Sequence, residues 1–430
     1  MKTSLAALAL ATLAVACTSS QEEPSEIQVE TARSPLARNT SPTLDAAEAA
    51  TFQKDEAAFA VELYRTVAEA EAGKDVFLSP HSVSTALAMT YAGARGATKD
   101  EMKKTLHFEL PDARLHDAFN WLDLALSSRG DGAAGKDGQP FRLRVVTSTW
   151  GQKGFSFEKP FLDTLAVSYG AGVNLLDFVE DTEGSRTTIN RWVEEQTEDR
   201  IKDLLPQGSL DALTRMVLVN AVYFNAAWAA KFDKAATKDA PFTKLDGSSA
   251  TVAMMSGKAA RRYAKGDGYE AVEIDYDGGE MAMLVVAPTA GTFASFEASL
   301  TGEKVLSVLA GLETKEVILS MPKFKLEAGL SLKEPLKKMG MPTAFGEADF
   351  TGISTAAPLQ IKDVLHKTFV EIDEDGTEAA AATAVIVGER TSAPVDDPIE
   401  MKVDRPFLVG IVDKQTQTLV FFGRILEPKL

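Results

Sequence analysis

Apolar residues recur along the chain with two different spacings, which predicts a protein that mixes helices and strands. Within residues 57–72, Phe59, Leu63 and Val67 recur every four positions, so they fall on one face of a helix. Residues 189–205 repeat this pattern and predict a second amphipathic helix. Both segments are interrupted by polar positions at regular intervals, which indicates helices that lie on the outside of a core.

Other apolar stretches have the pattern of strands. Residues 215–228 form a nearly continuous apolar run, which is typical of a central strand that is buried on both faces. Strands dominate the second half of the chain, where polar turns with glycine separate short apolar segments. The other predicted strands are 141–150, 271–276, 281–287, 317–326, 408–413 and 419–425.

One helix has a clear start signal. Ser79 and Pro80 suit the N-cap and the first turn, and the predicted helix then runs to Tyr91. A further helix is predicted to start at Gly96. The chain of 430 residues, 45% of them hydrophobic, is long enough to bury a large core.

The beginning of the chain predicts export and anchoring. Residues 1–16 have a basic start and a short apolar run, as in a signal peptide, and they lead to Cys17. The segment resembles a bacterial lipobox, so we expect Cys17 to be lipidated and the protein to be secreted and lipid-anchored to the cell envelope, at the outer membrane or cell surface. Residues 17–48 then predict a flexible tether, and residues 49–430 a single domain.

Composition and motifs argue against several function classes. A net charge of −17 is unsuited to nucleic acid, whose phosphates need a basic surface. The four histidines have no metal-ligand spacing, and neither a nucleophile elbow nor a P-loop is present in the sequence. Glycines 130, 132 and 135 have a nucleotide-binding spacing, but they follow a helix-like segment rather than a strand. We therefore expect neither an enzyme, nor a metal site, nor a cofactor.

Residues 371–391 have divided structural preferences. Thr377 is a good N-cap, and the four alanines 379–382 favour a helix. Val385 and its two β-branched neighbours favour a strand. One interpretation is a short helix that leads into an ordinary loop. The other is an exposed loop that can also become a strand between existing strands.

A resemblance distinguishes these interpretations. Residues 374–384 are similar, almost letter for letter, to the hinge of inhibitory serpins, and residues 78–96 and 348–353 resemble two further motifs of that family. The resemblance covers roughly residues 50–430. The hinge residues that it implies are Glu374, Gly376, Thr377, Glu378, Ala379, Ala380, Ala381 and Ala382.

The resemblance implies a fold and a function. The fold is α+β, with a large central mixed β-sheet, two smaller sheets, about eight or nine helices and an exposed reactive loop near 374–398. The function is suicide inhibition, in which the cut loop enters the central sheet and traps the protease. Cleavage falls fourteen residues after the hinge glycine, at Arg390–Thr391, so the expected targets are trypsin-like serine proteases, with cysteine proteases as a further class.

The same resemblance implies a monomer that contacts a membrane only through its lipid anchor. The alternative is a non-inhibitory serpin-fold binding protein, although such proteins often carry bulky residues or proline in the hinge. Thr377 is expected to be exposed in the intact loop and to face the core after insertion, with Glu378 toward solvent.

Two polar clusters are implied by the resemblance as conformational machinery. One, called the shutter, lies under the middle of the large sheet, and Thr147 stands where the family has a further asparagine. The other, called the breach, lies where the loop first enters, and a Lys–Glu pair there is expected to hold the hinge closed. The shutter residues are Ser79, Ser82, Asn220 and His366, and the breach residues are Trp228, Lys323 and Glu374.

Overall fold

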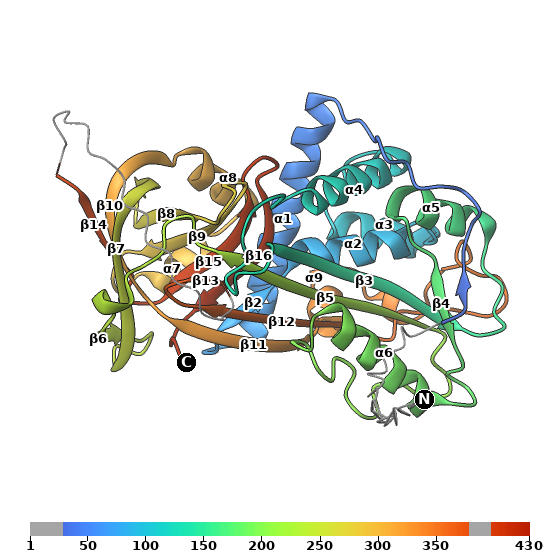
Figure 1. Cartoon of the computed structure of the whole chain (residues 1–430). Helices are drawn as coiled ribbons and strands as arrows, with labels where there is room; N and C mark the ends of the chain where they lie inside the picture. The colour runs from blue at the N-terminus through green and yellow to red at the C-terminus, as the bar shows by residue number, and fades with distance from the viewer. Residues whose placement is uncertain (1–28, 378–396) are drawn as a thin grey trace, which may run out of the picture.

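A computed structural model describes residues 29–377 and 397–430, and these residues contain nine α-helices and two large β-sheets (Figure 1). The fold is α+β with mixed sheets, as the sequence resemblance implied. Each sheet is hydrogen-bonded throughout, and the helices pack along their faces. The arrangement places one sheet at the centre of the molecule, and that sheet carries the candidate site.

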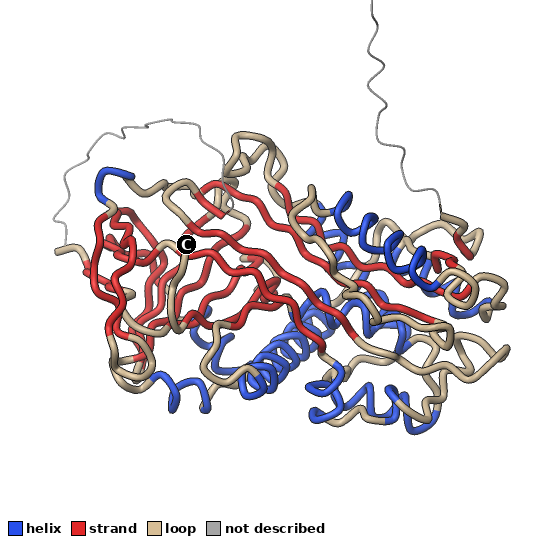
Figure 2. Tube along the Cα trace, turned by 90° about the horizontal axis from the view of Figure 1, so that it is seen from below, coloured by secondary structure: helices blue, strands red, loops and turns tan. Residues whose placement is uncertain are grey.

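The central sheet has seven strands. Its long strands run side by side across the molecule (Figure 2). Most neighbours in it are antiparallel, but β3 pairs with β4, and β5 with β12, in parallel. The β5 strand is buried along its whole length, as its apolar run predicted. The strands in spatial order are β1 (Thr31–Ala32), β4 (Val173–Leu176), β3 (Arg142–Gln152), β5 (Met216–Ala227), β13 (Gly376–Thr377), β12 (Val364–Ile372) and β11 (Phe324–Ser331).

The second sheet has nine strands, eight of them in one hydrogen-bonded path and the ninth, β6, beside β7. The two smaller sheets that the resemblance implied are continuous here, because the long β7 pairs with β6 and β10 along most of its length and with β8 at its end. In order, the strands are β14 (Ile399–Lys402), β10 (Glu313–Pro322), β7 (Ser249–Gly266), β8 (Tyr269–Asp275), β9 (Met281–Pro288), β15 (Phe407–Asp413), β16 (Thr418–Ile425) and β2 (Val76–Leu78), with β6 (Lys238–Thr243) beside β7.

Helices cover both faces of the central sheet. Figure 1 shows α2 on one side of β5 and α6 on the other. Alternate residues of β5 belong to the apolar clusters on these two sides, because successive side chains of a strand point to opposite faces. The helices are α1 (Ala46–Ala70), α2 (Pro80–Tyr91), α3 (Gly96–Thr105), α4 (Asp112–Ser127), α5 (Lys159–Tyr169), α6 (Thr182–Gln196), α7 (Phe293–Ala298), α8 (Gly302–Ala310) and α9 (Lys333–Met339).

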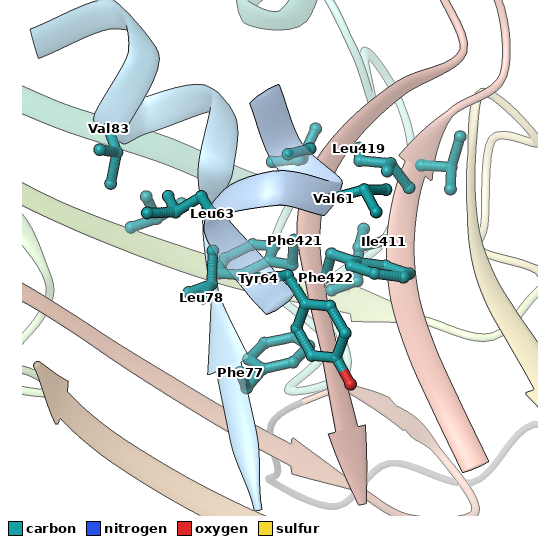
Figure 3. Close-up of a cluster of buried hydrophobic side chains, with 14 of the residues drawn as sticks. Val61, Leu63, Tyr64, Phe77, Leu78, Val83, Ile411, Leu419, Phe421 and Phe422 are labelled. Atoms are coloured by element: carbon teal, nitrogen blue, oxygen red, sulfur yellow. The ribbon is translucent and has the colours of Figure 1, made fainter. Parts of the chain in front are cut away.

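A dense apolar core joins α1, β2 and the β15–β16 hairpin (Figure 3). The rings of Phe77 and Phe421 are stacked with centroids 5.1 Å apart. Tyr64 of α1 meets Phe422 edge to face at 4.9 Å. Each of these aromatic side chains is buried, so this cluster contributes strongly to stability.

The helix predicted over 189–205 is wrong in its bounds. The structure has α6 at Thr182–Gln196, because the Asp181 carboxylate accepts a hydrogen bond from the backbone N–H of Gly184 and so caps the helix earlier. Glu198 and Asp199 both have positive φ, which a helix does not accommodate. The apolar residues after that point belong to a loop, but they are also buried, so in the sequence they continue the spacing of the helix.

The single strand predicted over 317–326 is also wrong. Two strands occupy this region, β10 and β11, and they belong to different sheets. Lys323 lies between them, and its backbone N–H is bonded to the carbonyl of Ala253 in β7. A continuous apolar pattern gives no sign of such a transfer between sheets, because both strands are buried on one face.

The predicted tether differs from the structure in its second part. Residues 31–32 form β1, which pairs with β4, and α1 already begins at Ala46. Between them, the Arg38 guanidinium binds the side chains of Asn120 and Asp123. Residues 17–28 lie outside the described residues. None of the described helices is long and apolar enough to span a membrane.

Candidate functional site

The central sheet changes its pairing between β5 and β12. From Val364↔Leu218 to Thr368↔Val222 the two strands pair directly and in parallel. Beyond these residues they separate, and β13 lies between their ends. Its two residues are antiparallel to both neighbours, with Thr377 opposite Ala226 of β5 and Ile372 of β12. A short strand therefore already occupies the entrance between β5 and β12.

Thr377 is fully buried, so the expectation that it is exposed is wrong. Its hydroxyl lies 2.7 Å from the hydroxyl of Tyr276, which is also buried, and this partner accounts for the burial of a polar side chain. Gly376 brings the strand close to β5, since a Cβ at this position would lie 2.2 Å from the carbonyl oxygen of Ala226. Its φ of +152° is also one that residues with side chains rarely adopt.

Trp228 holds the backbone just before this strand. Its indole N–H donates to the carbonyl of Asp373 at 2.8 Å, and its backbone N–H donates to the carbonyl of Asp375 at 3.0 Å. The indole is buried and stacks on Tyr276, with centroids 4.7 Å apart. The breach residue Trp228 thus fixes both the backbone and the aromatic partner of the hinge.

Three successive acidic residues, 373–375, each pair with a different part of the chain. Asp373 pairs with the buried Lys136 at 2.8 Å, and Asp375 with Lys234 at 2.6 Å. Glu374 pairs with Lys323 at 2.9 Å, so the expected Lys–Glu contact is present. The carboxylate of Glu374 is 5% exposed, which makes this more than a surface ion pair.

The charge states follow from these partners. Burial alone would raise the pKa of Glu374, but hydrogen bonds from Thr237 and Lys323 outweigh it and hold the pKa below its usual value. For Asp375, burial is likewise outweighed by hydrogen bonds from Lys234 and Lys231, and the pKa is lowered. Burial lowers the pKa of Lys136, and this effect outweighs the hydrogen bond to Asp373, which would raise the pKa. Both carboxylates therefore stay ionised at neutral pH.

The shutter residues meet under the middle of the sheet, where β5 and β12 pair directly. His366 accepts a hydrogen bond from the backbone N–H of Ser79 at its Nε2 atom, 2.9 Å away. Its Nδ1 atom lies 2.7 Å from the side-chain oxygen of Asn220, which also accepts from the Ser82 hydroxyl at 2.6 Å. Thr147 takes part as well, since it accepts from the Asn220 amide at 3.3 Å.

Burial lowers the pKa of His366 to about 3, so the ring is neutral at physiological pH. A neutral ring has one donor, and the Nε2 atom already accepts from Ser79, so the proton is assigned to Nδ1. The network is therefore built from neutral groups that can exchange hydrogen-bond partners.

Part of the predicted site lies outside the described residues. The structure also adds partners that the sequence did not predict, namely Tyr276, Asp373, Lys136 and Lys234. The run of acidic residues is visible in the sequence, but its partners are far away along the chain. In residues 29–377 and 397–430, no group of His, Cys, Asp and Glu side chains could hold a metal ion. The predicted residues outside the description are Cys17, Glu378, Ala379, Ala380, Ala381, Ala382, Arg390 and Thr391.

Comparison with known families identifies the class of protein that this sheet and hinge define. The model of the family Serpin (serine protease inhibitor) matches residues 54–428. The chain belongs to the serpin family. Members of this family are in general protease inhibitors rather than enzymes, although some bind other ligands instead.

Relatives and solved structures agree with this assignment. An uncharacterized serpin-like protein of Thermococcus kodakarensis is 38% identical, over 86% of this chain and 84% of the relative. The leukocyte elastase inhibitor of Bos taurus is 37% identical, over 86% and 97%. Among structures, the native thermophilic serpin tengpin has a TM-score of 0.79 at 26% identity, covering 93% of this chain and 100% of that one. Human thyroxine-binding globulin has a TM-score of 0.77 at 28% identity, covering 89% and 100%.

Proposed function

We propose that this serpin is a suicide inhibitor of trypsin-like serine proteases that is cleaved at Arg390–Thr391. The observation that carries the proposal is the position of β13, which lies antiparallel between β5 and β12 where these strands separate. A strand that continues from Thr377 would keep this direction and replace the parallel β5–β12 pairing. Parallel pairing is slightly less stable per residue than antiparallel pairing, so the exchange is favourable.

The chemistry belongs to the protease. Its serine attacks the carbonyl carbon of Arg390, the amine of Thr391 leaves, and the inhibitor remains bound as an acyl-enzyme. Residues 378–387 then follow Thr377 into the sheet over about 33 Å, at roughly 3.3 Å per residue. The linked protease is carried along and distorted before water can release it. The guanidinium of Arg390 suits a specificity pocket that contains a carboxylate.

The first test is incubation with trypsin followed by a denaturing gel. We expect a 1:1 complex that survives denaturation, and a released peptide whose first residue is Thr391. Arg390→Lys should retain the complex, because trypsin-like pockets accept either cation, whereas Arg390→Ala should abolish it. A peptide that starts at another residue, or no stable complex, would contradict the proposal.

A second test addresses insertion itself. Strand alternation places residue 381 on the same buried side as Thr377. Residue 380 falls on the other side, opposite Phe369 and Tyr223, whose rings already lie beneath the cationic groups of Lys325 and Arg142. In Ala381→Arg, insertion would bury a guanidinium, so we expect cleavage without trapping and recovery of protease activity. Ala380→Arg is the matched control and should still trap. Equal trapping by both variants would exclude insertion.

The alternative is a non-inhibitory serpin with a binding role. Alanines at 379–382 favour the inhibitory proposal, because small side chains can enter a sheet without clashes. A protein that trypsin cuts at Arg390–Thr391 without forming a complex, and that gains no stability from the cut, would support the alternative. Cysteine proteases form a second class of target and are tested in the same gel.

We also propose that the protein is a monomer, secreted and held at the cell envelope by a lipid on Cys17. The motive is the apolar run of residues 5–16 that ends at the chain's single cysteine. Cys17→Ser should release the protein from the membrane fraction, whereas deletion of residues 18–28 should not. Unchanged fractionation of Cys17→Ser would exclude the anchor. Light scattering of the soluble domain should give the mass of one chain.

A further inference from the structure

The glycine loop, residues 129–141, joins α4 to β3 and contains the glycines whose spacing is similar to a nucleotide-binding motif. Its backbone N–H groups already have anionic partners within the protein. The N–H of Gly130 donates to the carboxylate of Glu280 at 2.8 Å, and the N–H of Ala134 donates to that of Asp277, also at 2.8 Å. Concave arrangements of N–H groups are typical of anion-binding loops. Here the turn between β8 and β9 supplies the carboxylates, so the loop is attached to the nine-stranded sheet.

One side chain of the glycine loop, Lys136, is buried beside the hinge. Its backbone N–H donates to the side-chain oxygen of Asn225, near the end of β5, at 2.8 Å. The side chain is 1% exposed, and its ammonium lies 2.8 Å from a carboxylate oxygen of Asp373. In the part of the chain that the structure describes, this ammonium has no well-directed hydrogen bond. Buried ion pairs of this kind often add nothing to net stability, which points to a role in orientation.

Asp373 shapes the turn that precedes β13. Its Oδ1 atom accepts a hydrogen bond from the backbone N–H of Asp375 at 2.9 Å, and its own backbone N–H donates to the carbonyl of Gly376 at 3.1 Å. Lys136 contacts the other carboxylate oxygen, Oδ2. The turn reverses the chain, so that β13 runs antiparallel to β12. Its orientation therefore decides whether a strand that continues from β13 is directed between β5 and β12.

We propose that Lys136 is a positioning residue of the inhibitory reaction, and that it acts by holding the carboxylate of Asp373 so that the turn directs the cut loop into the central sheet. The proposal rests on the proposed inhibitory function and adds a residue to it. The glycine loop is the support, because Glu280 and Asp277 attach it to the nine-stranded sheet. A charged pair suits this role, because it favours one orientation of the turn, whereas apolar side chains of the same size have no preferred direction.

The first test compares Lys136→Met with Lys325→Met. Lys325 also pairs with an acidic residue near the end of β12, Glu371, but its side chain is 48% exposed and lies outside the turn. Two quantities are measured with trypsin: the association rate, and the ratio of released cleaved inhibitor to trapped complex. Association should not change, because the turn directs the loop only after the bond is cut. The ratio should rise about three- to ten-fold in Lys136→Met, as the loss of one hydrogen bond from the insertion step predicts, and should not change in Lys325→Met.

A second set of variants separates orientation from stability. Asp373→Asn keeps the Oδ1 acceptor for the N–H of Asp375 but removes the charge, so it should raise the ratio as much as Lys136→Met does. The double variant should raise the ratio no further, because both changes remove the same contact. It also leaves neither member of the pair charged and alone, so its midpoint of unfolding in denaturant should equal or exceed that of wild type.

The outcomes distinguish this proposal from the inhibitory function on which it rests. If wild type traps trypsin and the double variant keeps the wild-type ratio, or raises it only together with a lower midpoint of unfolding, the positioning role is wrong and the inhibitory function stands. Effects of the two single variants that add in the double variant would also contradict the positioning role. If wild type neither traps trypsin nor gains stability on cleavage, the inhibitory function itself is wrong.

Discussion

The nine-stranded sheet and the seven-stranded sheet differ in what holds their inner faces. Around the β15–β16 hairpin the contacts are between aromatic rings, such as Phe77 with Phe421, and the neighbouring strands pair antiparallel over long stretches. Between β5 and β12 the contacts include the neutral polar network of His366 and Asn220, and the strands are parallel over only five residue pairs. Burial of apolar side chains holds the core around β15–β16 together, whereas hydrogen bonds whose partners can be exchanged hold β5 and β12 together.

This difference assigns separate roles to the two sheets. Apolar packing has no alternative partner, so opening it costs the full burial energy. A hydrogen-bond network can open at small net cost when a new strand brings replacement donors and acceptors. We therefore expect the nine-stranded sheet to stay unchanged while the central sheet gains a strand. Substitutions in the two regions should separate stability from conformational change.

The largest effect is expected from Phe422→Ala. The ring is fully buried and meets Tyr64 of α1 edge to face, so its loss should lower the free energy of unfolding by about 3–5 kcal/mol. Because this core does not take part in insertion, intact and cleaved protein should lose similar amounts. Denaturant unfolding of both forms measures this. A loss confined to one form would show that the nine-stranded sheet also rearranges.

Acid should weaken the central sheet through His366. Its folded pKa of about 3 lies below the ordinary value of 6.5, so the unfolded chain binds the proton first as the pH falls. Stability is therefore lost from pH 6.5 downward, by about 2 kcal/mol at pH 5. Asp55, whose pKa burial raises to about 7, opposes this, and His116, lowered by burial to about 4, adds to it.

The comparison of wild type with His366→Gln isolates the shutter histidine from these other groups. Unfolding midpoints at pH 7.5 and pH 5 should show a smaller acid loss in the variant by about 2 kcal/mol. His116→Gln should reduce the acid loss by a similar amount, because His116 is the other histidine whose pKa is lowered by burial, and the two reductions should add. If His366→Gln leaves the pH dependence unchanged, the ring is not held neutral in the folded protein.

The sequence was sufficient for features that depend on local chemistry. Ser79 and Pro80 predicted the start of α2, and the apolar run predicted β5 within one residue at each end. The shutter set was predicted by resemblance, and the structure brings its members into one hydrogen-bonded network. The contacts in this network are buried hydrogen bonds, which require particular donors and acceptors at each position, so these residues could be identified from their types alone.

The remainder depended on contacts between distant parts of the chain. The burial of Thr377 is set by Tyr276, a hundred residues earlier, and no local propensity reports such a partner. Residues 31–45 have the composition of a linker, but Arg38 finds Asn120 and Asp123 on α4 and holds the segment in place. Polar segments are ordered or not according to the partners they meet, which composition does not show.

The smallest effect, and the one that bears most directly on the hinge, is expected from Thr377→Val. Valine keeps the shape of threonine but removes the hydroxyl that lies 2.7 Å from that of Tyr276, and it leaves the buried tyrosine without this partner. The free energy that favours the hinge in the sheet over a hinge outside it should fall by about 1–2 kcal/mol. Trp228 stacks on the same tyrosine, so its fluorescence should move toward that of a more exposed indole. Thr377→Ser retains the hydroxyl and should not show this change.

A faster association with trypsin in the valine variant, with an unchanged midpoint of unfolding, would show that the seated hinge restrains the loop rather than supporting the fold. If neither fluorescence nor association changes, the two-residue strand does not depend on the Tyr276 contact, and the position of the hinge is set by the ion pairs of residues 373–375 instead.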